Sequence, residues 1–161
     1  MKIFYQGSPG AYSNLAAIKA YPNAEIISCN TFDECFKKAK EDDSVRIIIP
    51  ESNSSTGNIG IESLIFKYRL NIYEECFYPI KHHLLVLPGS KMKDIKNVFS
   101  HAQALSQSSN FIKKNKLIEN VRADTAGSAK YIAESKKKDG AAIASKLSAK
   151  IYNLEILESN I

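Results

Sequence analysis

The stretch "IIIPESNSSTGNIG", residues 47 to 60, runs from three β-branched apolar residues directly into a cluster of small hydroxyl and amide side chains. The apolar residues predict a buried strand. Lysine and glutamate would make a surface loop just as polar, so polarity alone does not explain the cluster. An Asx turn explains one Asn or Ser, but hardly all of them. We interpret Asn53 and Ser54 as neutral hydrogen-bonding groups at the carboxyl end of a strand, where open α/β sheets bind ligands.

Elsewhere in the chain, predicted strands are followed by predicted helices. Short β-branched or aromatic runs alternate with segments of helical period, which is typical of βα units and a mainly parallel sheet. The predicted strands are residues 2–5, 25–28, 46–49, 97–100, 120–124 and 141–144. Capping residues predict helices over residues 13–20, 31–39 and 125–135. The sequence therefore predicts the α/β fold class.

A long segment rich in strand formers, residues 70–89, contains Pro79 near its middle. Because proline cannot donate to a sheet ladder, a bent crossing between two lobes fits this segment better than one central strand. We expect a first lobe over residues 1–75, a second over residues 76–155, and the start of a segment returning to the first lobe over residues 156–161. No repeat or low-complexity linker separates the lobes, so they should pack closely and share a cleft.

Composition places few limits on function. The chain has 161 residues, 44% of them apolar, which suits one ordinary globular domain. Its longest uncharged apolar run, around residues 84–87, is far shorter than the ~20 residues of a membrane span. We therefore expect a cytoplasmic protein without a membrane anchor. The three cysteines form no CxxC pair, so reduced thiols are expected rather than a disulfide framework or a zinc site.

The net charge of +5 fits either a nucleic-acid partner or an anionic small substrate. The lysines are dispersed except for residues 136–138, and that run is typical of a solvated helix end. A nucleic-acid partner is therefore disfavoured; it would show as retention on nucleic acid that falls steeply with salt.

A strand also meets a Gly/Pro turn and a helix start in "YQGSPGAYSNLAA", residues 5 to 17. The glycines permit close backbone approach, and the helix start near Ser13 offers N–H groups to an anion. A capped turn without a ligand is the alternative. The pattern is neither a Walker A motif nor G-x-G-x-x-G, so it does not indicate a nucleotide. A similar junction comes later, where Asp124 and Thr125 end a predicted strand and open a helix.

In "FSHAQALSQSSNFI", residues 99 to 112, Ser100 ends a predicted strand before a helix that carries Gln103 and Gln107. The two glutamines are four residues apart and so lie on one helical face. His101 is a candidate general acid, although a histidine beside a helix start is more often a structural hydrogen-bonding residue.

Four junctions of this kind in one small chain predict a cleft lined with neutral hydrogen-bond donors. Substrate carboxylates are the obvious ligands. His82 and His83 are adjacent in a strand-like segment, so they would point to opposite faces and make a poor metal pair. The sequence thus predicts a small anionic substrate and no metal site.

The ordered motifs of the chain closely resemble the catalytic domain of prephenate dehydratases and the related arogenate dehydratases. The motifs are "GSPGAYSNLAA" at residues 7–17, "PESNSSTG" at 50–57, "SHAQALSQ" at 100–107, "DTAGSAKYIA" at 124–133 and "AAIASKLSAKIYNLEIL" at 141–157. The similarity runs through essentially all 161 residues.

The resemblance implies a two-lobed α/β fold similar to type 2 periplasmic binding proteins, with the active site between the lobes. It implies a lyase reaction of phenylalanine biosynthesis, in which prephenate loses carbon dioxide and its ring hydroxyl and becomes phenylpyruvate. Arogenate, which carries an amino group in place of the side-chain keto group, stays open as the substrate. The resemblance implies neither a metal nor an organic cofactor, and it leaves a homodimer open.

The resemblance also implies roles for individual residues. The residues expected to take part in catalysis are Asn53, Ser54, Ser100, Gln107 and Thr125. Those expected to bind substrate are Pro9, Gly10, Ala11, Tyr12, Ser13, Asn53, Ser100, His101, Gln103, Thr125 and Ala126. Neutral groups of this kind bind carboxylates without a positive charge that would oppose decarboxylation.

Two departures from the family pattern bear on activity. Ser52 stands where the family has Glu, and Glu51 comes one place earlier. Family members also continue to an Asn-x-Thr-Arg-Phe motif, whose Thr is regarded as the proton donor to the departing hydroxyl, and these residues contain no such motif. Impaired turnover is therefore expected unless Glu51 or His101 serves as the acid. The alternative is a binding module that holds an aromatic or dicarboxylate ligand in the same cleft without chemistry.

Overall fold

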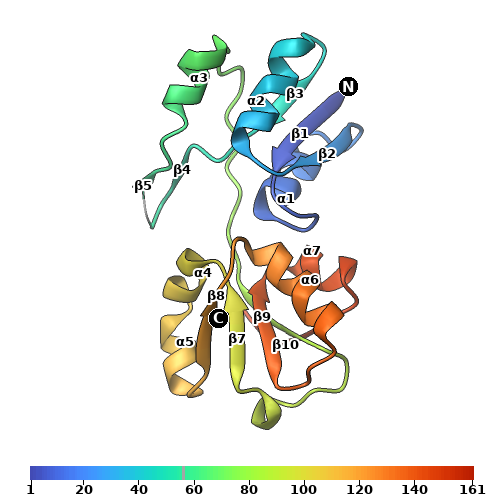
Figure 1. The fold of residues 1–161 in the computed structure, drawn as a ribbon, viewed down its shortest axis with the longest axis vertical. Coiled ribbons are helices and arrows are strands. Elements are labelled where there is room, and N and C mark those ends of the chain that lie inside the picture. Colours follow the sequence, from blue (N-terminus) through green and yellow to red (C-terminus); the bar gives the residue numbers. More distant parts are fainter. Residues whose placement is uncertain (56) are drawn as a thin grey trace. The chain divides into compact units, whose positions relative to one another are not determined.

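The computed structural model describes residues 1–55 and 57–161 and shows the expected alternation of strands and helices (Figure 1). Contacts divide the chain into two units, each with its own sheet. The first unit contains residues 1–7 and 12–78, and the second contains residues 8–11 and 79–161. The α/β fold class predicted from the sequence is confirmed. The unit boundary lies at residues 78 and 79 rather than 75 and 76, and the short loop of residues 8–11 belongs to the second unit.

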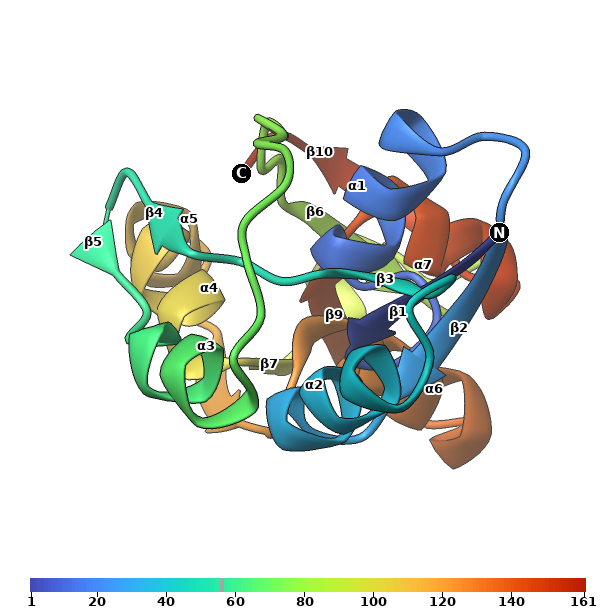
Figure 2. The same ribbon diagram turned by 90° about the horizontal axis from the view of Figure 1, so that it is seen from above.

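The first unit is built on a parallel three-stranded sheet in the order β2-β1-β3. Its strands are β1 (Lys2–Gln6), β2 (Glu25–Cys29) and β3 (Arg46–Ile48), and its helices are α1 (Tyr12–Ala20), α2 (Phe32–Glu41) and α3 (Glu62–Tyr68). Helices α1 and α2 cover opposite faces of this sheet (Figure 2). A two-stranded ribbon, β4 (Ser52–Asn53) and β5 (Gly57–Asn58), follows β3. The predicted cap at Thr31 is present, because its hydroxyl accepts a hydrogen bond from the Glu34 N–H group at 3.1 Å.

The second unit has a five-stranded sheet in the order β10-β6-β9-β7-β8. Its strands are β6 (His83–Val86), β7 (Asn97–Ser100), β8 (Ile118–Val121), β9 (Gly140–Ala144) and β10 (Glu155–Ser159). The helical segments are η1 (Met92–Asp94), α4 (Ala102–Gln107), α5 (Ser109–Lys114), α6 (Thr125–Ser135) and α7 (Lys146–Ile151). Strands β7, β8 and β9 are parallel, whereas β6 runs antiparallel to both of its neighbours.

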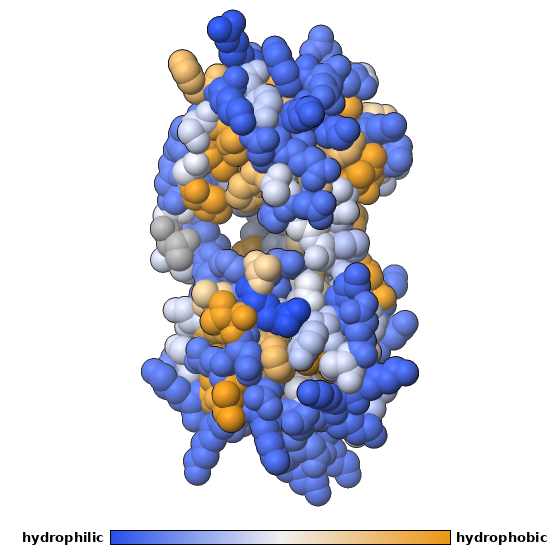
Figure 3. Space-filling model, viewed as in Figure 1, coloured by the Kyte–Doolittle hydropathy of each residue, from blue (hydrophilic) through white to orange (hydrophobic). Residues whose placement is uncertain are grey.

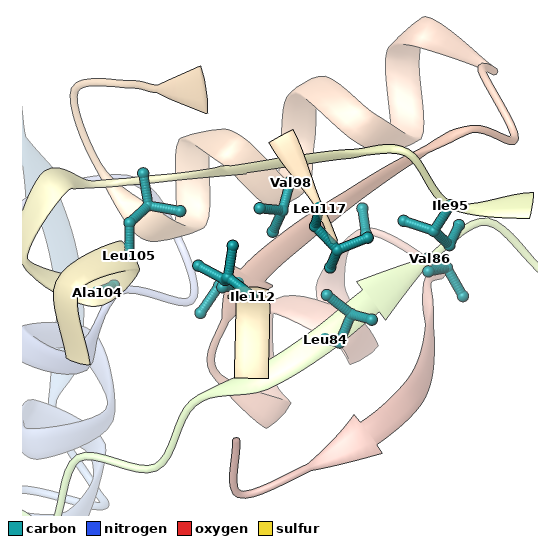
Figure 4. Close-up of a cluster of buried hydrophobic side chains, with 10 residues drawn as sticks. Leu84, Val86, Ile95, Val98, Ala104, Leu105, Ile112 and Leu117 are labelled. Carbon is teal, nitrogen blue, oxygen red and sulfur yellow. The ribbon is translucent and has the colours of Figure 1, made fainter. Parts of the chain in front are cut away.

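The core of the second unit lies on both faces of its sheet. Leu84 and Val86 of β6 pack into one cluster, with Leu105 of α4 and Ile112 of α5 (Figure 4). Leu85 points to the other face and packs with residues of α6 and α7. Every residue of β6 and β9 is buried. This is why β9 and residues 84–86 of β6 are uninterrupted apolar or small-residue runs instead of alternating patterns.

Two sequence expectations differ from the structure. Strand β8 ends at Val121, so the strand predicted over residues 120–124 is shifted. Residues 156–161 are predicted to start a return to the first lobe, whereas β10 instead pairs with β6 and completes the second unit's sheet. The physical reason is burial, because Ile156 and Leu157 of β10 pack against the two core clusters of this unit.

The surface is mostly hydrophilic on the face shown in Figure 3, with smaller apolar areas between the polar side chains. This agrees with a chain in which 24% of the residues are charged. Among the helices of the described residues, none combines the length and the apolar character of a membrane span.

Candidate functional site

One edge of the second unit's sheet gathers the starts of three helices. Because β7, β8 and β9 are parallel, their carboxyl ends lie at the same edge, where α4, α6 and α7 begin (Figure 1). A side chain caps each helix by accepting a hydrogen bond from a backbone N–H group. His101 Nδ1 accepts from Gln103 at 3.3 Å, Asp124 Oδ1 accepts from Gly127 at 2.6 Å, and Ser145 Oγ accepts from Ser148 at 3.1 Å.

The loop of residues 8–11 is held against this edge by hydroxyl groups. The carbonyl oxygen of Gly10 accepts from Ser145 Oγ at 2.6 Å and from Ser148 Oγ at 3.1 Å. The Tyr152 hydroxyl donates to the carbonyl oxygen of Pro9 at 2.9 Å. Burial raises the pKa of Tyr152, and this favours the protonated phenol that donates here. Three hydroxyl groups that follow β9 therefore hold the carbonyl oxygens of this loop in place.

Gly10 is required by its surroundings. Its φ angle is +94°, and a Cβ atom there would lie 2.5 Å from Ser148 Oγ and 3.0 Å from Ser148 Cα. Both the positive φ and the close approach favour glycine. The side chain of Ala11 is buried, and Pro9 is exposed.

Asp124 connects the same loop to helix α6. Its Oδ2 atom accepts from Ser8 Oγ at 3.3 Å, while Oδ1 caps the helix. Thr125 follows at the first position of α6 and is half-buried, so its hydroxyl lies at the helix start. Ala126 is fully buried, and a ligand contact through its methyl group is therefore excluded in this conformation. Asp124 adds a carboxylate to an edge that the sequence predicted to be lined with neutral groups.

Ser100 does not reach the edge as an exposed group. Its side chain is 0% exposed, and its hydroxyl donates to the carbonyl oxygen of Ile143 at 2.6 Å. The hydroxyl thus joins β7 to β9 inside the sheet. This structural role was not anticipated from the sequence, because the position at a strand end indicated a cleft residue.

Gln103 and Gln107 lie on the short helix α4 and differ in exposure. Gln103 is half-buried and Gln107 is exposed. The Oε1 atom of Gln107 lies 2.8 Å from Nε2 of His82, whose side chain is buried. His83 accepts a hydrogen bond at Nδ1 from the Asn160 N–H group at 3.4 Å. The two adjacent histidines therefore have separate partners.

The first unit carries the remaining predicted residues. Asn53 is half-buried, and its Oδ1 atom accepts from the Ser55 N–H group at 2.8 Å, which is an Asx turn. Ser54 and Glu51 are exposed. The turn proposed as the alternative explanation for one residue of the cluster is thus present at Asn53.

Tyr12 and Ser13 begin α1 and are both half-buried. Burial raises the pKa of Tyr12 above its ordinary value, and Tyr78 raises it further. The sequence reasoning missed Asn14, which is only 7% exposed. A lone amide between small and apolar residues was the available signal, since a buried amide needs hydrogen-bond partners.

The sequence reasoning also missed the residues that hold the edge together. Ser145, Ser148 and Tyr152 lie in one of the quoted motifs, yet no role was assigned to them. Ser148 lies in α7, and Ser145 and Tyr152 are its N-cap and C-cap residues. Their spacing of three and four residues, which brings side chains to one side of a helix, is the available signal. Within residues 1–55 and 57–161, no group of three His, Cys, Asp or Glu side chains is placed to hold a metal ion.

Parallel strands that end in hydroxyl, amide and carboxylate groups define an α/β protein with a polar edge to its sheet. The chain matches the family model described as "Prephenate dehydratase" over residues 3–161. It therefore belongs to the prephenate dehydratase family, as the resemblance of its motifs indicated.

Individual relatives agree with this family. Arogenate dehydratase 2 of Petunia hybrida is 42% identical over 162 aligned positions, which cover 100% of this chain and 41% of the relative. "Arogenate dehydratase/prephenate dehydratase 6, chloroplastic" of Arabidopsis thaliana is also 42% identical, with 100% of this chain and 40% of the relative covered. The chain spans about two fifths of the length of these relatives.

The fold is also similar to that of a solved structure described as GqqA, a novel type of quorum quenching acylase. The two chains have a TM-score of 0.88 at 31% sequence identity, and the match covers 100% of this chain and 59% of the GqqA chain.

The relatives correct one expectation. A cytoplasmic protein was expected from composition, but several relatives that match the whole chain are named chloroplastic. The reason for the error is that folded domains of both compartments have ordinary soluble compositions, so composition does not separate them.

Proposed function

We propose that this chain forms the substrate-binding and catalytic part of a prephenate or arogenate dehydratase. The observation that carries this proposal is the family match over residues 3–161. In the proposed reaction the bond between the ring and its carboxylate breaks and releases carbon dioxide. The electron pair enters the ring as the bond to the ring hydroxyl breaks, and the hydroxide leaves as water after it gains a proton. Prephenate gives phenylpyruvate, and arogenate gives phenylalanine.

The polar edge of the second unit supports this chemistry. Prephenate carries two carboxylates, and Thr125, Gln103 and Gln107 offer neutral donors for them. A cation beside the reacting carboxylate would stabilise the ground state more than the transition state, because negative charge leaves that group during decarboxylation. Neutral donors avoid this cost. We propose that Gln107 and Thr125 contact substrate at this edge.

Four residues of the first unit belong to the proposal as well. We propose that Tyr12, Ser13, Asn53 and Ser54 contact substrate, as the family pattern implies. The amide oxygen of Asn53 is held in the Asx turn, and this fixes the orientation of the carboxamide. Ser100 acts differently in this proposal. Its bond to Ile143 fixes the end of β7, so it supports the edge from within the sheet.

A proton must reach the departing hydroxide. A positioned general acid typically contributes ~10²–10⁴ in rate. His101 is exposed, and its Nδ1 atom accepts the capping hydrogen bond from the Gln103 N–H group. Proton donation requires the imidazolium form, which carries a proton on each ring nitrogen, so this capping hydrogen bond must open when His101 acts as the acid. We propose His101 or the exposed Glu51 as the acid within these residues.

The experiment is calorimetric titration of the chain with prephenate and with arogenate, together with an assay for phenylpyruvate and phenylalanine. Thr125→Ala and Asn53→Ala should weaken binding about tenfold or more. Asn23→Ala, which changes an exposed Asn in the loop between α1 and β2, is the matched control and should have no effect. If the chain binds neither prephenate nor arogenate, the proposal is wrong.

A binding module is the second candidate, because the hydrogen bonds at this edge fit a ligand without requiring chemistry. It predicts saturable binding of prephenate with no product at any protein concentration.

A homodimer also stays a proposal, and light scattering of the purified chain across a concentration series tests it.

A further inference from the structure

The contact between His82 and Gln107 joins a buried group to an exposed one. Nε2 of His82 lies 2.8 Å from Oε1 of Gln107. The His82 side chain is 8% exposed, whereas Gln107 is exposed at the end of α4. A buried imidazole is therefore in direct contact with a residue that the proposed function places on the substrate.

The chemistry of the two groups fixes which one donates. Burial lowers the pKa of His82, so the ring is neutral near pH 7. A neutral imidazole has one N–H group, and a carboxamide oxygen only accepts. The contact to Oε1 therefore needs the proton on Nε2 of His82. The carboxamide of Gln107 is thereby oriented with its NH₂ group on the side away from the ring.

The donor lies on a well-fixed part of the sheet. His82 directly precedes β6, which is paired with β9 on one side and β10 on the other. The carbonyl oxygen of His82 accepts from the Ile161 N–H group at 3.1 Å. Gln107, by contrast, is the last residue of a six-residue helix. An exposed glutamine has three side-chain torsions to restrict, and a fixed partner on a rigid element restricts them before a ligand arrives.

We propose that His82 is a positioning residue, which holds the amide oxygen of Gln107 so that the amide NH₂ group is presented to a substrate carboxylate. This inference rests on the proposed function, because it assigns the carboxylate of prephenate or arogenate to Gln107. Nothing in the sequence signals it, since residue 82 lies outside the five motifs, just before β6, and residue 107 ends α4.

Two variants of His82 separate positioning from simple packing. His82→Gln keeps an N–H donor at a similar reach, and His82→Met fills the buried space without a donor. With prephenate as the titrant, His82→Met should raise the Kd about tenfold, equivalent to about 1.4 kcal/mol. His82→Gln should stay within about threefold of the parent chain, as expected when one hydrogen bond is kept.

The double variant His82→Met with Gln107→Ala adds an internal control. Because the two side chains act as one unit, it should bind prephenate no more weakly than Gln107→Ala alone. Additive losses in the double variant overturn the proposal, as does a His82→Met chain with unchanged Kd. A His82→Gln chain as weak as His82→Met reduces His82 to a packing residue and overturns it too.

A spectroscopic readout separates this inference from the proposed function. Nitrogen NMR of the ligand-free chain should show His82 with its proton on Nε2, and His82→Met should shift the side-chain amide protons of Gln107. A proton on Nδ1 overturns the assigned orientation whatever the chain binds. If NMR shows the assigned orientation and the parent chain binds neither prephenate nor arogenate, the proposed function fails and the carboxylate assignment fails with it.

Discussion

At the scale of single residues, the best-defined feature is the carbonyl oxygen of Gly10, which accepts hydrogen bonds from two serine hydroxyl groups of the second unit. The sequence predicted this glycine as a place of close approach, and the positive φ and the contact with Ser148 agree. What approaches it was not predictable, because Ser145 and Ser148 lie more than 130 residues away in the sequence. Local sequence patterns identify a glycine whose backbone another group approaches closely, but they do not identify the residue that approaches it.

Gly10→Ala should destabilise the second unit by roughly 2 kcal/mol or more. A left-handed φ alone costs an L-residue roughly 1–2 kcal/mol, and the new Cβ would also lie 2.5 Å from Ser148 Oγ. Urea unfolding followed by a probe in the second unit measures the loss.

Gly89→Ala is the matched control, because Gly89 has a φ of +76° and no atom within 4 Å of the added Cβ. The free energy of unfolding of this variant should fall only by the amount that a positive φ costs an alanine. Equal losses in the two variants would show that the serine contacts impose no steric requirement at Gly10.

At the scale of elements, the βα alternation was predictable from sequence, and most predicted strands lie within a residue or two of the observed ones. Strand β6 was not separated from residues 70–89, because a strand buried on both faces has no alternating pattern to mark its ends. Strand β10 was not predicted either. Its pairing with β6 depends on apolar contacts across the sheet, which a linear pattern does not contain.

Leu85→Ala should destabilise the second unit by about 2–5 kcal/mol, the usual range for a fully buried leucine. Leu85 is 0% exposed in the central part of the sheet, between β10 and β9. Ile118→Ala on β8 of the same sheet is the control, because Ile118 is 61% exposed. Chemical denaturation of both variants gives the comparison, and similar midpoints for the two would contradict the burial of β6.

At the scale of the whole molecule, the family was predictable from the ordered motifs, while the structure adds how the polar edge is held. The hydroxyl network around residues 8–11 and the buried position of Ser100 could not be read from the motifs, because both depend on which strands are neighbours. The motifs identify the polar residues near the strand ends, and the order of the strands in the sheet decides which of these residues are exposed.

Stability should fall as the pH is lowered below about 6.5, the ordinary pKa of histidine in an unfolded chain. Burial lowers the pKa of both His82 and His83, so the unfolded chain binds protons that the folded chain does not yet accept. The stability contributed by the neutral rings is complete above about pH 6.5 and declines until the pH falls below their lowered pKa values.

Urea midpoints at a series of pH values between about 5 and 8 measure this dependence. The double variant His82→Gln with His83→Gln should lose the part of the slope that lies in this window. An identical slope in the parent and the variant would assign the pH dependence to other groups.

Product formation from prephenate and from arogenate by the purified chain is the most direct test of the proposed activity. A buffer blank corrects for the spontaneous breakdown of prephenate, and calorimetric titration on the same samples reports binding. We expect phenylpyruvate or phenylalanine to form at a rate above the blank, with saturable binding of the corresponding substrate. A chain that forms no product and binds neither compound would contradict this expectation.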